Sequence, residues 1–465
     1  MSDSIISQLA MAENSSVIAP AGCGKTEVIA RAVSLQGQGR SLLLTHTHSG
    51  VRSLKDRLKR LNVPTEHYRV DTIASWALKI SISFPQLSEN MINQPVGDEW
   101  KVVYKKAQNA LQYQNIRYIV QHSYTGIYVN QDSLILSLSE LLPVRILGDP
   151  LQGIFDFGDD PLINWNEDVI PNFPEIGPLN FPWRWNRTNP ELGEWLNEIR
   201  RNLVQGDEIN LLSAPKAAAV FWRQYSRQEA ISVCYKAIAR QGSIVVLHKW
   251  KGQAHNFASK LGGEFTSMEE IECEDLLVWA KRLDEGGGRD YCLNLIEGSI
   301  MCWTGISTEL RSIRSSIENN KHPNSRKYRN INQSMIHIME NPDDSDLLLP
   351  ALIQCGEIGK VLYRKELWEE MQNVLRTYRT GKFESYEDTA WYIRNLSRIR
   401  GGRTGNRIVS RTLLIKGLEF DHVIIANADT LDDPKNLYVA MTRCKYSLTI
   451  LSKSPIIKRT AFGSN

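Results

Sequence analysis

The chain has 465 residues, and its 55 Lys and Arg against 52 Asp and Glu leave a formal net charge of +3. At roughly 150 residues per domain, this length predicts two to four domains. The content of 42% hydrophobic and 23% charged residues excludes wholesale disorder. The near-zero charge also excludes a protein that coats nucleic acid by bulk charge, so any nucleic-acid binding must come from local patches.

The sequence lacks the features of a secreted or membrane protein, which indicates its cellular compartment. No apolar run approaches the roughly 18 residues of a membrane span, and the N-terminus lacks the basic region and cleavage site of a signal peptide. The seven cysteines are scattered, odd in number and form no CxxC pair. We therefore expect a cytoplasmic protein with no membrane partner, no disulfide framework and no structural zinc.

Short apolar runs that alternate with amphipathic helices predict a parallel α/β sheet, interrupted and then resumed near the C-terminus. The predicted strands cover residues 15–19, 41–47, 124–129, 143–149, 243–250, 407–415 and 422–429. From about residue 262 to 400 the pattern changes to long amphipathic helices, which indicates an all-α insertion. The basic, glycine-containing residues 394–407 are typical of a linker or surface loop.

A glycine-rich segment, APAGCGKT, lies between a predicted strand and a predicted helix. Gly22 and Gly24 allow a tight turn that brings backbone amides to phosphates at the helix N-terminus. In this context Lys25 would neutralise the β- and γ-phosphates, and the Thr26 hydroxyl would bind Mg²⁺. We therefore predict a nucleotide-binding loop made of Ala19, Pro20, Ala21, Gly22, Cys23, Gly24, Lys25 and Thr26.

Further motifs follow the phosphate loop in a fixed order. They are GDPLQ at residues 148–152, WR at 183–184, KGLEFD at 416–421 and YVAMTR at 438–443. With GKT, this ordered set resembles the UvrD/Rep/PcrA-like superfamily 1A DNA helicases. LLLTHTHSGVRSLKDRL and VDTIASWAL resemble further segments of that family, and the middle helical region is left unmatched.

The resemblance implies an α/β fold of two RecA-like P-loop NTPase lobes, with a helical insertion in the second and ATP in the cleft between them. Residues 1–185 would form lobe 1A, with a short insertion at about 80–120. Lobe 2A would comprise residues 186–261 and 401–465, and residues 262–400 would form a 2B-like helical insertion.

Three residues resemble the family's γ-phosphate machinery. Gln152 resembles the glutamine that senses the γ-phosphate and couples it to DNA movement. Arg184 and Arg443 resemble the two arginines that clamp this phosphate from the second lobe. Such cations stabilise the charge that spreads over a transferring phosphoryl group.

The remaining nucleotide contacts are implied in the same way. Gln8 resembles the upstream glutamine that reads adenine, and Glu419 resembles a glutamate near the ribose. Trp183 could stack on the adenine as the family's aromatic residue does, with a tryptophan buried in the core as the alternative.

The resemblance also implies contacts with single-stranded DNA. Phe157 corresponds to an aromatic residue that stacks on a base, and Thr45 and Thr47 would donate hydroxyls to phosphate oxygens. His46 would stack or touch phosphate, with local packing as an equal alternative. Three basic stretches are candidate tracks for the DNA backbone or simply solvated faces: residues 55–60, 311–329 and 394–407.

One family motif, of the form DEYQD, is missing after the strand that ends at Val129, and Asp132 belongs to the following helix. In the family its aspartate holds Mg²⁺ and its glutamate polarises the attacking water, so hydrolysis without them should fall by orders of magnitude. Two interpretations stay open. One is a natural or engineered pseudo-helicase, and the other is a natural protein with a short block that the printed sequence lacks. We favour the second because the other catalytic positions are kept.

Smaller departures affect single positions. Ala19 stands where the phosphate-loop pattern has glycine, and Cys23 is interpreted as a small residue that fits the loop, because nothing supplies a resolving thiol. Gly158 stands where the family has arginine, while Arg411 and Leu413 replace a threonine and a histidine. These differences concern coupling to DNA more than the nucleotide site.

The resulting hypothesis is an ATP-dependent translocase or helicase that moves 3′ to 5′ on single-stranded or tailed duplex DNA, with ATP and Mg²⁺ as cofactors. Compact UvrD-like proteins of this sort occur in anti-phage systems such as Gabija, which suggests an OLD-family nuclease as a partner. The alternative is an ATP-binding, hydrolysis-deficient pseudo-helicase that acts as a DNA-binding or scaffold subunit. A P-loop kinase or GTPase needs neither Arg184 nor YVAMTR and is disfavoured.

Overall fold

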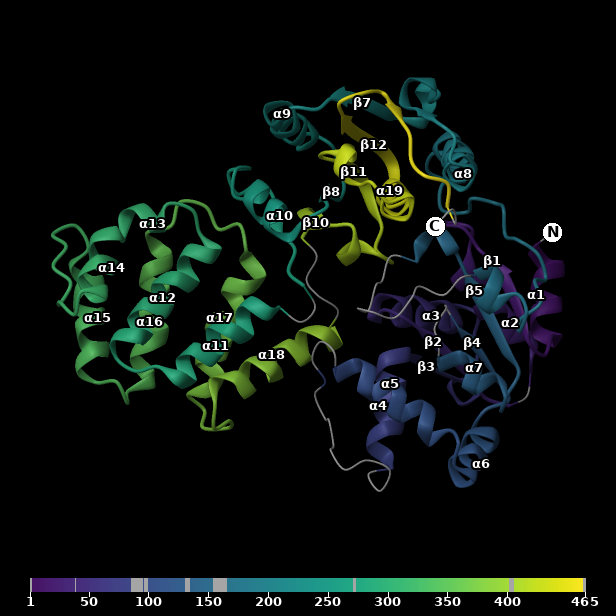
Figure 1. Cartoon of the computed structure of the whole chain (residues 1–465), viewed down its shortest axis with the longest axis horizontal. Coiled ribbons are helices and arrows are strands. Elements are labelled where there is room, and N and C mark those ends of the chain that lie inside the picture. The colour runs from purple at the N-terminus through teal and green to yellow at the C-terminus, as the bar shows by residue number, and fades with distance from the viewer. Residues whose placement is uncertain are drawn as a thin grey trace.

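The computed structural model of the chain has two α/β lobes and a separate helical region (Figure 1). It describes residues 2–37, 39–84, 95, 99–129, 134–153, 165–270, 273–400 and 405–462. In Figure 1 the first lobe is purple to blue at the right, the second is teal and yellow at the top, and the helical region is green at the left. The α/β class expected from the sequence is confirmed, with parallel sheets that are consistent with RecA-like lobes.

The first lobe is built on a parallel sheet in the order β1-β5-β4-β2-β3. Its strands are β1 (Ser15–Ile18), β2 (Ser41–Thr45), β3 (Tyr68–Thr72), β4 (Gly126–Val129) and β5 (Val144–Gly148). Both faces are buried, as parallel sheets require: Leu42 and Leu44 belong to one hydrophobic cluster and Leu43 to another. Because the strands are parallel, the loops after β1, β2 and β5 meet at one edge.

Helices cover both faces of this sheet (Figure 1). They are α1 (Ser2–Met11), α2 (Lys25–Leu35), α3 (His48–Arg60), α4 (Ile73–Ser83), α5 (Glu99–Ala110), α6 (Gln114–Ser123) and α7 (Leu134–Ser139). Two of them begin at hydroxyl caps, which satisfy free backbone amides: Thr47 accepts from the amide of Gly50, and Thr72 accepts from the amide of Ser75.

The second lobe contains a parallel sheet in the order β7-β12-β11-β8-β10-β9. Its strands are β7 (Val220–Gln224), β8 (Ile244–His248), β9 (Thr266–Ser267), β10 (Arg407–Arg411), β11 (Phe420–Ile425) and β12 (Cys444–Ser452), and β6 (Ile209–Asn210) pairs separately with β13 (Ile456–Ile457). Because β9 pairs with β10, residues 266–267 belong to this sheet, whereas the sequence pattern placed them in the helical insertion.

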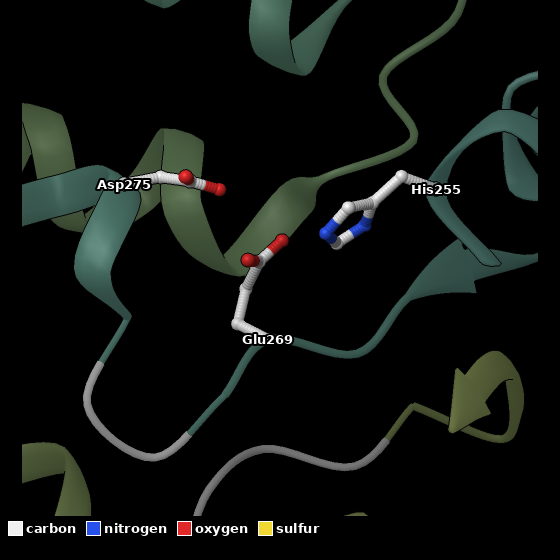
Figure 2. A group of neighbouring side chains, drawn as sticks. All are labelled: His255, Glu269 and Asp275. Atoms are coloured by element: carbon white, nitrogen blue, oxygen red, sulfur yellow. The ribbon is translucent and has the colours of Figure 1, made fainter. Parts of the chain in front are cut away.

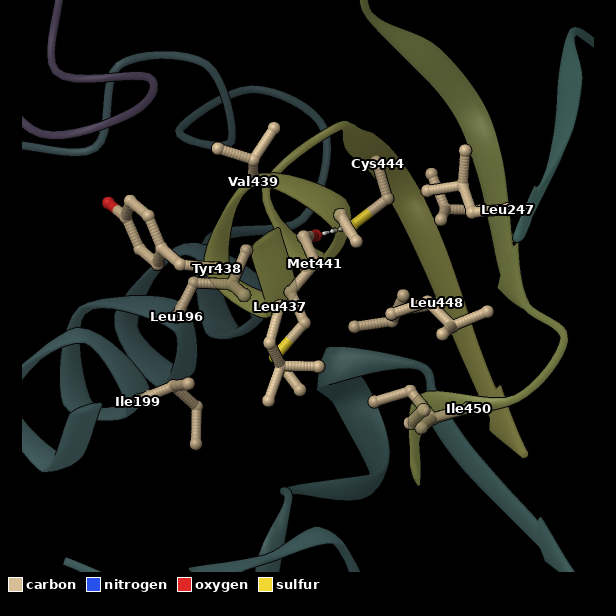
Figure 3. Packing of buried hydrophobic residues seen from close by; sticks show 14 of the residues in the cluster. Leu196, Ile199, Leu247, Leu437, Tyr438, Val439, Met441, Cys444, Leu448 and Ile450 are labelled. Carbon is tan, nitrogen blue, oxygen red and sulfur yellow. Dashed lines mark hydrogen bonds between the residues drawn. The ribbon is translucent and has the colours of Figure 1, made fainter. Parts of the chain in front are cut away.

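Two helices pack against each other on one face of this sheet. They are α8 (Pro190–Gln205) and α19 (Pro434–Met441). Figure 3 shows Leu196 and Ile199 of α8 on one side of α19, with Leu448 and Ile450 of β12 on the other side. The sheet's other face carries α9 (Arg227–Ala237) and α10 (Lys251–Ala258). The motif residues that follow α19 are thus fixed by a buried core.

The helical region has a hydrophobic core of its own, made by residues between 273 and 393. Its helices are α11 (Glu274–Glu285), α12 (Arg289–Cys302), α13 (Ile306–Glu309), α14 (Arg311–Glu318), α15 (Arg329–Glu340), α16 (Leu348–Glu357), α17 (Lys365–Tyr378) and α18 (Tyr386–Arg400). The prediction of a linker or loop over residues 394–407 is wrong in its first half, because α18 continues to Arg400. Within the described ranges, no helix is both long enough and apolar enough to cross a membrane.

Candidate nucleotide site between the lobes

The phosphate loop connects β1 to α2 and turns on two glycines. Gly22 and Gly24 have φ angles of +73° and +84°, in the left-handed region that favours glycine. A Cβ atom on Gly22 would lie 2.5 Å from the ring of Trp185, so packing requires glycine there as well. Lys25 begins α2 directly after the turn. This geometry places a lysine at a helix N-terminus, where backbone amides favour a phosphate.

Two tryptophans from the segment between the lobes pack against this loop. Trp185 is 1% exposed and donates a hydrogen bond of 2.7 Å from Nε1 to the carbonyl oxygen of Cys444. Trp183 is 52% exposed, and its ring lies 3.0 Å from the ideal Cβ position of Gly24. Phe181 meets Trp183 edge to face at 4.4 Å between ring centroids. Trp185 is therefore the core tryptophan, and Trp183 presents an open aromatic face beside the phosphate loop.

Arg443 reaches the cleft from the second lobe, directly after α19. Its side chain is buried, and Nε donates to the carbonyl oxygen of Val439 at 3.0 Å. Nη2 donates to Oε1 of Gln152 at 3.1 Å. Gln152 ends a short 3₁₀ turn, η3 (Pro150–Gln152), at the carboxyl end of β5 in the first lobe. One hydrogen bond therefore joins the predicted γ-phosphate residues of the two lobes.

Asp149 holds Gln152 in place. The Nε2 of Gln152 donates to Oδ2 of Asp149 at 2.7 Å, while Oδ1 accepts from the amide of Leu151 and from Arg200 at 3.3 Å each. Asp149 is 2% exposed. A buried carboxylate that accepts hydrogen bonds from this many donors fixes the orientation of the glutamine amide.

Arg184 links the phosphate loop to the second lobe. Its backbone amide donates to the carbonyl oxygen of Gly22 at 3.1 Å, and Nη2 lies 2.9 Å from Oε1 of Glu419. Its Nη1 donates to the carbonyl oxygen of Thr442. Burial raises the pKa of Glu419, but Arg184 and Lys445 outweigh burial and lower it overall. Glu419 is thus an ionised partner of Arg184, and its contact with ribose stays a prediction.

A cavity of about 80 Å³ lies between these groups. Its lining comprises Lys25, Thr45, His46, Thr47, Asp149, Gln152, Lys416 and Gly417. Pockets for whole ligands usually have about 300–1,000 Å³, so this cavity matches one part of a nucleotide, such as a phosphate group. The loop after β2, predicted to contact DNA, therefore shares the cavity with the predicted phosphate lysine.

The cations around the cavity destabilise one another. Burial lowers the pKa of Lys25, and Arg443 and Arg184 add to the decrease while Asp149 opposes it. Burial lowers the pKa of Arg443 to about 9, with Arg184 contributing. For Lys416, burial followed by Lys25 and Arg443 lowers the pKa to about 7. A multiply charged anion in the cavity would relieve this repulsion.

Cys23 lies within the loop but is not set up for redox chemistry. It is 1% exposed, and burial, with the charge of Asp149, raises the pKa of its thiol to about 12. The thiol is therefore protonated at neutral pH, and a protonated thiol is a poor nucleophile. This agrees with the interpretation of Cys23 as a small residue that fits the loop.

The described residues supply an incomplete set of ligands for Mg²⁺. Thr26, the second residue of α2, offers one hydroxyl. Asp149 is the carboxylate that lines the cavity, but its two oxygens already accept hydrogen bonds from Arg200, Gln152 and Leu151. Mg²⁺ prefers oxygen ligands that include one or two carboxylates. Residues 130–133, where the family's carboxylate motif would begin, lie outside the described residues, and Mg²⁺ at Thr26 stays a prediction.

The other predicted contact residues are distributed more widely. Gln8 lies on the exposed side of α1, whose Ile6 and Leu9 face the core, and it does not line the cavity. Phe157 and Gly158 lie outside the described residues, so the predicted base stack is not described. Adenine recognition by Gln8 and base stacking by Phe157 both stay predictions.

The three basic stretches differ in how many charges are already paired. Arg57 and Arg60 both form ion pairs with Glu27, at 3.0 and 2.5 Å. In the second stretch, Arg314 and Lys327 also pair with carboxylates. In the third stretch, Arg394 is only 3% exposed, so the prediction that it contacts DNA is wrong. The ion pairs make these cations weaker candidates for a DNA backbone track, and the alternative of solvated faces stays open for the first two stretches.

A second cluster of polar side chains brings together residues of the types that bind metals. Figure 2 shows His255, Glu269 and Asp275 pointing toward one another where the second lobe joins the helical region, with candidate ligand atoms within 4.8 Å. Arg364 already occupies both carboxylates: Nε and Nη2 contact Glu269 at 2.8 and 2.6 Å, and Nη2 contacts Asp275 at 2.6 Å. Burial lowers the pKa of His255 to about 4. The cluster is an ion-pair network that fixes the joint.

Two residues of the site are not among the contacts that the sequence predicts. Asp149 stands in GDPLQ and Lys416 in KGLEFD, so both were inside recognised motifs. Neither type of residue is unusual at a surface, and their role becomes visible only when the cavity brings residues of both lobes together.

No protein-family model matches the chain, and no curated protein matches it. Among solved structures, the chain is similar to the Pif1 helicase from Candida albicans, with 10% sequence identity and a TM-score of 0.31. The likeness covers 57% of this chain and 54% of that one, so the chain spans about half the length of the protein it matches. A likeness of this extent leaves the family and activity of the chain undecided.

Proposed function

We propose that the chain is an ATP-dependent translocase or helicase that acts on single-stranded DNA. The observation that carries the proposal is the hydrogen bond of 3.1 Å between Gln152 and Arg443, which joins the lobes beside a cavity that contains the phosphate-loop lysine, Lys25. A nucleotide in this position would contact cations of both lobes. Its binding and release would therefore change how the lobes close on each other.

Chemistry at the site follows from the arrangement of charges. Lys25 approaches the phosphates from the first lobe, while Arg443 and Arg184 approach from the second lobe and the connecting segment. Negative charge on the terminal phosphate increases as it is transferred, and fixed guanidinium groups stabilise it. To bind this phosphate, Arg443 would exchange its bond to Gln152 for a bond to phosphate oxygen.

Coupling to DNA would pass through the loop after β2. Thr45, His46 and Thr47 line the same cavity as Lys25, so a DNA phosphate or base that displaces this loop would alter the nucleotide site directly. Thr47 also caps α3 through the amide of Gly50 at 3.1 Å, which ties the loop to a helix of the first lobe. DNA binding should therefore depend on nucleotide, and it should weaken as salt rises.

The finer assignments rest on the sequence resemblance. They are ATP with Mg²⁺ as cofactors, movement from 3′ to 5′, tailed duplex DNA as a further substrate, and an OLD-family nuclease as partner in anti-phage defence. We propose them as part of the same function.

The test is steady-state ATP hydrolysis by the full chain with and without single-stranded DNA. We expect turnover that DNA stimulates, together with its loss in Arg443→Ala. The matched control is Arg282→Ala, an exposed arginine that pairs with Glu297 in the helical region. Turnover that DNA does not change, in protein that binds both ATP and DNA, would exclude the translocase.

One observation favours a second candidate, a subunit that binds ATP and DNA without hydrolysing ATP. Asp149, the carboxylate in the cavity, is engaged by Arg200 and Gln152, so among the described residues it is not available to activate water. Such a subunit would bind nucleotide and change its DNA affinity with no turnover. The same assay separates the candidates, since both predict ATP binding and only one predicts hydrolysis.

A further inference from the structure

Three neighbouring strands of the first lobe bring polar side chains together in one row. Arg145 of β5 is paired in register with Ser15 of β1 on one side and with Tyr128 of β4 on the other. Residues that are paired in this way project their side chains to the same face of a sheet. That face is otherwise apolar, with Val17 and Leu147 in the cluster that α1, α2 and α3 cover. We call Ser15, Arg145 and Tyr128 the polar row.

The polar row is buried, and the protein leaves several of its polar atoms without a partner. Ser15, Arg145 and Tyr128 are 2%, 4% and 1% exposed. Within the described part of the chain, Oγ of Ser15, Nε of Arg145 and the Tyr128 hydroxyl have no hydrogen-bond partner. Nη1 of Arg145 donates to the carbonyl oxygen of Pro143, but at a long 3.4 Å. Since buried polar atoms almost always have partners, three unpartnered atoms in one row indicate a bound species.

The charge of Arg145 indicates what this species is. Burial lowers the pKa of Arg145, and no carboxylate among the described residues opposes the shift. The guanidinium carbon lies 5.4 Å from the centroid of the Tyr128 ring, which attracts a cation only weakly. Burial raises the pKa of Tyr128 to about 12, although Arg145 opposes the increase, so the phenol is neutral near pH 7. Arg145 is thus a buried cation that lacks a counter-ion.

Gly126 leaves room beside the guanidinium group. It lies two residues before Tyr128 on β4, and a Cβ atom there would lie 2.2 Å from Nη1 of Arg145. The hydroxyls and the guanidinium group can all donate hydrogen bonds. A water molecule would accept some of these bonds but leave the charge of Arg145 unbalanced, whereas an anion would do both. Arg145 lies four residues before Asp149, about 13 Å along the chain, so the polar row is separate from the nucleotide cleft.

We propose that the polar row binds a chloride ion, held by the guanidinium group of Arg145 and the hydroxyls of Ser15 and Tyr128. The ion would join β1, β5 and β4 and so stabilise the first lobe. This proposal is independent of the proposed function, because it involves no contact with nucleotide or DNA. An ion that binds only the folded protein stabilises it by mass action, so chloride should stabilise this protein more than other anions do at equal ionic strength.

The first test is the line width of the ³⁵Cl NMR signal of sodium chloride in the presence of the full chain, because bound chloride relaxes rapidly and broadens the signal. Arg145→Met should broaden it less than wild type, and this difference should saturate with chloride and give Kd. The matched control is Arg69→Met in β3 of the same sheet, since Arg69 has 38% of its side chain exposed and lies 3.7 Å from Asp71. It should behave as wild type. Chloride bound by cations of the cleft contributes equally to all three proteins and cancels.

The second test is urea denaturation in sodium chloride and in sodium gluconate, whose anion is too large for the polar row. With chloride at about ten times Kd, the ratio of folded to unfolded wild type should be about tenfold higher than in gluconate, and Arg145→Met should show no such difference. Tyr128→Phe keeps the ring and removes one donor, so chloride affinity should fall by about three- to tenfold.

Three results would overturn the proposal. One is broadening by folded Arg145→Met that equals that of wild type. Another is equal stability of wild type in the two salts, which is expected if the polar row holds only water. If Arg145→Met does not fold, Tyr128→Phe decides the question, because chloride affinity equal to that of wild type would exclude the site.

Discussion

The cleft between the lobes and the joint between the second lobe and the helical region both concentrate buried charge, but they balance it differently. Among the described residues around the cleft, cations outnumber carboxylates. The cations are Lys25, Arg184, Arg200, Lys416, Arg443 and Lys445, and the carboxylates are Asp149 and Glu419. At the joint, four cations meet five carboxylates within the part of the chain that the structure describes. These are Lys251, Arg364, Arg394 and Arg411 with Glu269, Glu270, Asp275, Glu366 and Glu370.

Each of these charges at the joint has at least one partner of opposite sign. Arg364 contacts Glu269 and Asp275, and Arg394 contacts Glu370 through Nη1 at 2.6 Å. Arg394 also donates to the backbone carbonyl of Glu270, in the connection that leads out of the second lobe. Buried charges with this many partners specify one arrangement of the elements that carry them, because moving any one of them would leave an unpaired charge.

The difference separates a structural network from a ligand site. At the joint, the protein supplies both signs of charge and the network is complete without a ligand. In the cleft, burial lowers the pKa of Lys25, Lys416 and Arg443, and neighbouring cations lower it further, so a phosphate would offset the positive charge there. Substitutions in the cleft should therefore change function with little change in stability, and substitutions at the joint should do the reverse.

The largest effect is expected for Arg443→Ala. Removing this guanidinium takes away the stabilisation of charge on the transferred phosphate, so DNA-stimulated turnover should fall by about 10³-fold or more. The measurement is steady-state ATP hydrolysis at saturating DNA, with circular dichroism as a check on folding. A decrease of less than about tenfold would place Arg443 outside the γ-phosphate site.

Arg364→Met should lower the stability of the protein and leave nucleotide binding unchanged. It leaves Glu269 and Asp275 without their shared partner, and breaking a buried ion pair in this way costs about 3–5 kcal/mol in free energy of unfolding. Urea denaturation measures this cost, and the affinity for ATPγS should stay unchanged. As a control, Arg282→Met removes an exposed arginine and should cost less than about 1 kcal/mol. Equal costs for the two substitutions would contradict a structural role for the joint.

The joint should also give the stability of the protein a pH dependence. Burial, with Glu370 and Glu269 nearby, raises the pKa of Glu366 from 4.5 to about 7, although Arg394 opposes the shift. The folded state therefore holds this proton more tightly than the unfolded chain, so the contribution of Glu366 to stability falls as pH rises from about 4.5 to 7. In the wild type, Glu366 should lower the free energy of unfolding by about 1–3 kcal/mol between pH 5 and 8. Glu366→Gln should abolish this part of the pH dependence. Parallel stability profiles for wild type and variant would exclude this assignment.

The smallest effect in this set is expected at the rim of the cleft. Trp183→Ala removes the open aromatic face beside Gly24, and stacking on a base is worth about 1–3 kcal/mol, so ATPγS affinity should fall by roughly tenfold. Trp183→Phe should retain most of the affinity because the smaller ring still stacks. If the alanine variant binds ATPγS as tightly as wild type, Trp183 does not contact the base.

The α/β class and the strand, turn and helix around Gly22 and Gly24 were predictable from short sequence patterns. Apolar runs and glycines determine the backbone conformation of the few residues around them. The edge strand β7 was missed because its alternate side chains are exposed and it contains no buried apolar run. The burial of Arg394 was missed because its partners, Glu366 and Glu370, lie 28 and 24 residues away. A run of charged residues resembles a solvated surface in the sequence, because its distant ion-pair partners become visible only in the structure.

The cleft illustrates the same limit at the level of the site. Lys25 was predictable because its neighbours in sequence are its neighbours in space. Lys416 shares a cavity with Lys25 and Gln152 only because the two lobes contact each other. A local sequence pattern does not predict that contact.

The most direct test of the link between the cleft and DNA is the affinity of the full chain for a fluorescent single-stranded oligonucleotide, measured with saturating ATPγS and without nucleotide. Because Thr45–Thr47 share a cavity with Lys25, the two affinities should differ by about fivefold or more, and Lys25→Ala should abolish the difference. DNA affinities that are identical with and without ATPγS, in protein shown to bind ATPγS, would contradict this link.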